Sequence, residues 1–86
     1  MTISRQEQAT FAKTILPLIK KADSLEKLDA LYARVISFNK NVGYKDNGIS
    51  FDLGEYLYEI IQNTKGKEPS GWDKEALRSL KEQLGE

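Results

Sequence analysis

The segment from Asp46 to Gln62 constrains the fold of this 86-residue chain more than any other stretch. It runs from a turn signal, Asp46-Asn47-Gly48, into a stretch whose apolar residues recur at three- and four-residue steps. The recurring positions are Leu53, Tyr56, Leu57, Ile60, Ile61 and Thr64. On a helix these positions form a stripe about 140° wide, as expected of a helix buried against at least two neighbours. The chain is therefore predicted to be organised around one central helix.

Three further segments carry a helical period. Ser4 to Glu7 fits a capping box, and an apolar stripe that follows it predicts a first helix despite Pro17. Because the stripe continues through Pro17, we expect one kinked helix and not two short ones. The expected helices are near residues 4–21, 24–38, 50–64 and 71–84. They predict an all-α fold, a small antiparallel-type four-helix bundle in a single domain of residues 1–86, with a long loop, residues 39–49, between helices 2 and 3.

Two residues of the central segment carry local expectations. Ser50 is predicted to be the N-cap of the third helix, because a serine oxygen can accept a hydrogen bond from a free amide in the first turn. Gly54 should weaken that helix by about 1 kcal/mol relative to alanine. A glycine tolerated there is expected to mark the close approach of another backbone.

The composition argues against several classes of function. The sequence contains neither cysteine nor histidine, which removes disulfides, thiolate metal sites and the commonest general base. Residues 46–57 have the outline of an EF-hand, but in either register the calcium-ligand positions lack the required carboxylates. No nucleophile–base pair or phosphate-binding loop is visible. We therefore expect no enzyme activity, no metal and no cofactor.

The termini and the apolar runs bear on location. No apolar run approaches the ~18 residues of a membrane span, and the N-terminus lacks the apolar region of a signal peptide. A chain without cysteine suits a reducing compartment. These features predict a cytoplasmic protein without a membrane span.

The charges are unevenly distributed along a chain of zero net charge. Residues 1–45 hold eight lysines and arginines against four carboxylates, whereas residues 46–86 hold five against nine. The two halves can attract each other within one fold, or the protein can be dipolar and pair head to tail or dock a charged partner. The basic residues of the first half also leave nucleic-acid binding open, although the sequence pI of about 6.3 and the missing RNA-binding and zinc-finger signatures disfavour it. These residues are Lys13, Lys20, Lys21, Lys27 and Arg34.

A candidate recognition surface lies on a second side of the central helix. Phe51 and Tyr58 are seven residues apart and project to one side of it, and aromatic residues supply much of the binding energy of interfaces. The alternative is that the 39–49 loop or the last helix covers them. The carboxylates Asp52, Glu55 and Glu59 are expected to face water and not to form a catalytic cluster. The predicted partner-binding residues are Tyr44, Phe51, Asp52, Glu55, Tyr58 and Gln62.

The favoured function is a non-catalytic module that binds another protein, such as a small regulator, inhibitor or immunity-type factor, through helix 3 and the loop before it. Its size and helix count are similar to those of bacterial nuclease-toxin immunity proteins. The strongly acidic surface and the adjacent paired tyrosines of that family are missing, so the resemblance assigns no family. The alternative is a nucleic-acid-associated accessory protein that uses the basic first half. The sequence leaves the identity of the partner, and the choice between monomer and homodimer, open.

Overall fold

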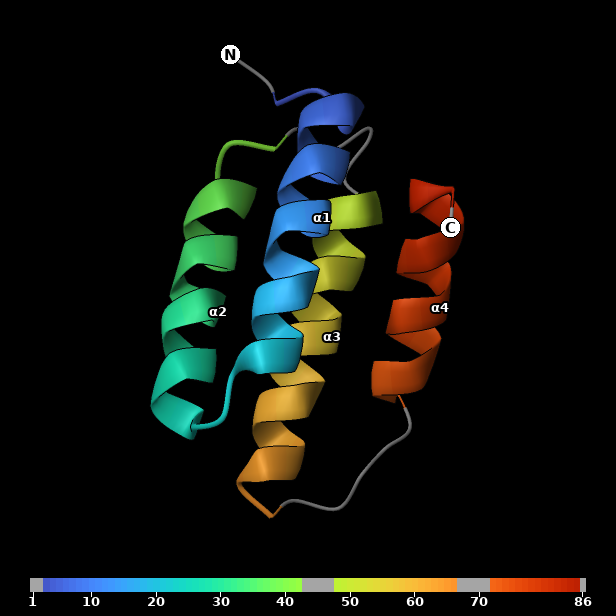
Figure 1. Ribbon diagram of the computed structural model, residues 1–86. Helices are drawn as coiled ribbons and strands as arrows, with labels where there is room; N and C mark the ends of the chain where they lie inside the picture. Colours follow the sequence, from blue (N-terminus) through green and yellow to red (C-terminus); the bar gives the residue numbers. More distant parts are fainter. Residues whose placement is uncertain (1–2, 43–47, 67–71, 86) are drawn as a thin grey trace.

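Four helices account for the fold. The computed structural model describes residues 3–42, 48–66 and 72–85, apart from the side chains of residues 72 and 73. The helices are α1 (Arg5–Lys21), α2 (Leu25–Asn39), α3 (Gly48–Thr64) and α4 (Trp72–Leu84). Successive helices run in opposite directions (Figure 1). The predicted all-α four-helix bundle is confirmed, and the described residues contain no strand.

Serine side chains begin the first two helices. Ser4 Oγ accepts a hydrogen bond from the Glu7 amide at 3.1 Å, and Ser24 Oγ accepts one from the Lys27 amide at 3.2 Å. In the usual capping box the glutamate side chain accepts a hydrogen bond from the backbone amide of the capping serine. Here the Glu7 carboxylate accepts one from the Ser4 hydroxyl, at 3.2 Å. Each serine satisfies an amide that has no partner within its own helix.

The prediction that Ser50 caps the third helix is wrong. The helix already begins at Gly48, and Ser50 is a buried residue of its first turn. The Ser50 hydroxyl donates a hydrogen bond to Oε1 of Gln8 in α1 at 3.0 Å. Asn39 at the end of α2 donates to the Ser50 carbonyl at 3.2 Å. Ser50 therefore links α3 to α1 and α2 by hydrogen bonds and does not cap α3.

Pro17 lies inside α1 and does not split it, so the prediction of a single first helix is confirmed. Proline removes the hydrogen bond to the carbonyl of Lys13, one turn earlier. Both residues are exposed, so water can satisfy that carbonyl.

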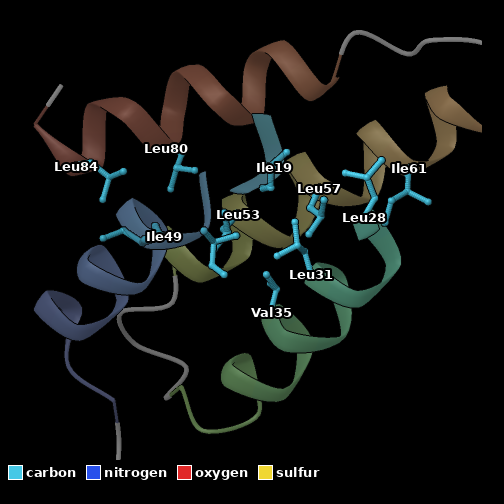
Figure 2. Close-up of a cluster of buried hydrophobic side chains, with 12 residues drawn as sticks. Ile19, Leu28, Leu31, Val35, Ile49, Leu53, Leu57, Ile61, Leu80 and Leu84 are labelled. Atoms are coloured by element: carbon cyan, nitrogen blue, oxygen red, sulfur yellow. The ribbon is translucent and has the colours of Figure 1, made fainter. Parts of the chain in front are cut away.

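The helix α3 lies at the centre of the bundle. It packs against each of the other three helices, whereas α4 packs against α3 and makes few contacts with α1 or α2. In Figure 1, α1 crosses in front of α3, with α2 and α4 on either side. Figure 2 shows side chains from all four helices converging on those of α3. The buried apolar side chains are Ala12, Ile15, Ile19, Leu28, Leu31, Val35, Ile49, Leu53, Leu57, Ile61, Ala76, Leu80 and Leu84.

The apolar stripes of the first two helices are not buried along their whole width. Leu18 on α1 and Ile36 on α2 are 37% and 38% exposed. On α1, Ala12 and Gln8 are buried. The polar Gln8 is buried because its side-chain oxygen accepts hydrogen bonds from Ser50. Within the described residues, no helix is long and apolar enough to cross a membrane.

The prediction that Gly54 marks a close backbone approach is wrong. A Cβ atom at this position would meet the side chains of Asn39 and Val35 at 3.5 and 3.9 Å, which are ordinary van der Waals distances. The space beside α2 therefore accommodates an alanine.

Replacing a buried side chain of the central helix with alanine should destabilise the fold strongly. Leu57 is fully buried, so Leu57→Ala should lower the free energy of unfolding by about 2–5 kcal/mol, because a cavity remains. Chemical denaturation measures the change. A loss within about 0.5 kcal/mol of zero would contradict the central role of α3, since only surface substitutions have so small an effect.

Gly54→Ala should raise the free energy of unfolding by about 0.5–1 kcal/mol, because alanine lowers the entropy of the unfolded chain and favours the helix. The matched control is Gly66→Ala: this glycine has a φ of +84°, where a side chain is strained, so the same substitution should destabilise. Thermal melts of the two variants should shift in opposite directions.

Candidate protein-binding face of α3

One side of α3 is left uncovered by the other helices. Helices α1, α2 and α4 pack against its remaining sides, and in Figure 1 α1 lies in front of α3, with α2 and α4 on either side. Helical geometry places Phe51, Glu55, Tyr58 and Gln62 on this side, because they follow one another at three- and four-residue steps. We call these four residues the α3 face.

The two aromatic residues of the α3 face are the most exposed large apolar side chains among the described residues. Phe51 is 62% exposed and Tyr58 is 45% exposed. Because they are seven residues apart, they lie about 10 Å apart along the helix. Both rings are therefore accessible to solvent.

The helix α2 extends this surface. The ring of Tyr58 lies 6.2 Å from the ring of Tyr32, centre to centre, with the planes tilted by 45°. This contact restrains the Tyr58 ring. Ile36, one turn beyond Tyr32 on the same side of α2, is 38% exposed. The sequence did not predict Tyr32 or Ile36 as part of this surface, although both belong to the apolar positions of the second helix, which could have indicated them.

Asp52, predicted to be a partner-binding residue, forms hydrogen bonds to α4. Its Oδ2 atom accepts a hydrogen bond from the hydroxyl of Ser79 at 2.7 Å and another from the side-chain amide of Gln83. Both donors belong to α4, so Asp52 ties α4 to α3. Glu55 and Gln62 are half-buried residues of the α3 face. Tyr44 lies outside the described residues.

A cleft with an acidic lining runs beside Phe51 between α3 and α4. It has a volume of about 360 Å³. Among the described residues that line it, Asp52, Glu55 and Glu75 carry carboxylates and none is basic. Glu75 also pairs with Arg78 at 2.7 Å. That hydrogen bond and the charges of Glu75 and Glu82 raise the pKa of Arg78 above its ordinary value.

The opposite side of the molecule is basic. Two grooves flank α1, one lined by Lys13, Lys20 and Lys81 and the other by Lys21, Lys27 and Arg34. Among the described residues, the ion pairs are Lys27–Asp23 and Arg78–Glu75, and each lies within a single segment of the chain. The two halves of the sequence are therefore not joined by an ion pair in the described part.

No group of three metal-ligating side chains occurs among the described residues. Comparisons of the chain with protein-family models, curated proteins and solved structures found no match.

Asp52→Ala should lower the free energy of unfolding by about 1–2 kcal/mol, because it removes the acceptor of two half-buried hydrogen bonds between α3 and α4. Glu55→Ala is the matched control, one turn away on the same helix, and should stay within about 0.5 kcal/mol of the parent. Urea denaturation compares them; equal losses would mean that Asp52 does not anchor α4.

Proposed function

We propose that this protein is a non-catalytic module that binds another protein through the α3 face, as a small regulator, inhibitor or immunity-type factor. The observation that carries the proposal is the exposure of Phe51 and Tyr58, at 62% and 45%, on the one side of the central helix that no other helix covers. Exposed apolar side chains that share one patch with a polar rim are typical of interaction sites.

The surroundings of the two rings indicate the chemistry of the partner. Glu55 and Gln62 form a polar edge beside them, and the cleft next to Phe51 is lined by carboxylates. An apolar centre with a polar rim is the usual anatomy of an interface. The acidic rim favours a partner that presents lysine or arginine around an apolar patch.

The cysteine-free composition suits a reducing compartment, so the proposal places this binding in the cytoplasm. The second candidate function is nucleic-acid binding through the basic residues that flank α1. The carboxylate and the aromatic rings of the α3 face would not take part in nucleic-acid binding.

The deciding measurement is site-specific photo-crosslinking in the native host. A benzophenone amino acid at Gln62, next to Tyr58 on the α3 face, should form an adduct with a second protein, whereas the same group at Lys21, on the basic side, should not. An adduct from position 21 that disappears on nuclease treatment would instead support nucleic-acid binding.

With the crosslinked partner in hand, Tyr58→Ala should weaken binding by about 2 kcal/mol or more, roughly 30-fold. It should cost less stability than Leu57→Ala, because Tyr58 is 45% exposed. Leu18→Ala is the matched control: this side chain is 37% exposed on α1, so its truncation should leave the affinity unchanged. If Tyr58→Ala unfolds the protein as strongly as Leu57→Ala, the ring belongs to the core and not to a binding face.

A further inference from the structure

A second concave surface lies on the opposite side of α4 from the acidic cleft. It is a groove between α1 and α4 with a volume of about 440 Å³. Leu16, Pro17 and Leu77 give it apolar walls, and Lys13, Lys20 and Lys81 also line it. The groove exists because α4 packs against α3 and hardly touches α1. We call it the basic groove.

The lysines of the basic groove carry charges that the described part of the chain does not neutralise. None of the three lies within ion-pair distance of a carboxylate there. Lys13 and Lys20 are seven residues apart, so they mark two points about 10 Å apart along α1. An occupant that presents an apolar group flanked by carboxylates would match both the walls and the charges.

The chain itself presents such a surface. Phe51 stands at the edge of the acidic cleft beside Asp52, Glu55 and Glu75. Asp52 accepts hydrogen bonds from the neutral side chains of Ser79 and Gln83 and forms no ion pair within the described residues. The helix α4 therefore separates an apolar groove lined by lysines from an exposed aromatic ring beside carboxylates.

We propose that the basic groove binds a second copy of this chain, which inserts Phe51 between α1 and α4 and places its carboxylates against the lysines. The zero net charge of the chain means that two copies do not repel each other overall. The phosphates of a nucleic acid would use the lysines but leave Leu16 and Leu77 in water. The second copy uses both.

The two contacting surfaces are different, so the contact is heterologous and each copy keeps one surface free for the next. The proposal rests on the proposed function in one respect, since Phe51 serves both. Self-association then hides the α3 face at high concentration and releases it on dilution.

Sedimentation equilibrium at low salt tests the contact without any other partner. The weight-average mass of the parent should rise from that of the 9.8 kDa monomer by roughly twofold or more at millimolar concentration, without a plateau at the dimer. Added salt should lower it, because exposed ion pairs are screened. Lys20→Ala with Lys81→Ala should remain monomeric, and so should Phe51→Ala. The matched control, Lys21→Ala with Lys27→Ala, makes the same charge change in the other groove and should associate like the parent.

Mixing the two monomeric variants provides the sharper result. The variant with Lys20→Ala and Lys81→Ala, called the lysine variant, keeps its Phe51 surface, and Phe51→Ala keeps its basic groove. One contact can therefore form between the two variants, so an equimolar mixture should form dimers and nothing larger. The proposal is overturned if the parent protein stays monomeric. It is also overturned if the variant with Lys20→Ala and Lys81→Ala still associates. A mixture that stays monomeric while the parent associates also overturns it.

Two further measurements separate the alternatives. The first is the binding of a short DNA duplex. If the duplex binds the parent saturably but not the lysine variant, and the parent does not self-associate, the groove belongs to nucleic acid and the proposal is overturned. The lysine variant should still give the Gln62 crosslink, because its α3 face is unchanged. Self-association without that crosslink would reject the proposed function alone, and the crosslink without self-association would reject this inference alone.

Discussion

The burial of α3 is the constraint on which the rest of the structure depends. Its inward side chains, such as Leu53 and Leu57, are almost completely excluded from water, and one neighbouring helix could not cover so wide a stripe. Three helices therefore gather around it. The dependence is strongest for α4, which packs against α3 and hardly against the others. Without α3, α4 would have no surface on which to bury Leu80 and Leu84.

Apolar burial holds the helices together, and hydrogen bonds select how they are aligned. The hydrophobic effect has no direction, so it tolerates a helix that slides or rotates by a small amount. The bond from Ser50 to Gln8 and the bonds from α4 to Asp52 require particular atoms to meet. Breaking them would leave a buried or half-buried polar group without its partner, which is unfavourable. These contacts align α1 and α4 along the central helix.

The same arrangement sorts the charges onto two sides. Each helix turns its apolar stripe inward, so the residues on either flank of the stripe face opposite grooves. On α4, Lys81 lines the basic groove and Glu75 lines the acidic cleft. On α1, Lys13 and Lys20 reinforce the basic side. A chain of zero net charge therefore presents two surfaces of opposite sign, and the aromatic ring of Phe51 stands on the acidic one.

The periodicity of the sequence determined the helices, because an amphipathic stripe and a capping serine are local signals. The four helices, the single first helix through Pro17 and the cap at Ser4 could all be predicted. Local signals could not predict that Ser50 is buried against Gln8, since that contact joins residues far apart in the chain. The pairing of Tyr58 with Tyr32 and the use of Asp52 by α4 likewise required the packed helices. Whether Phe51 is covered also depends on where the neighbouring helices stop, and only the tertiary structure decides that.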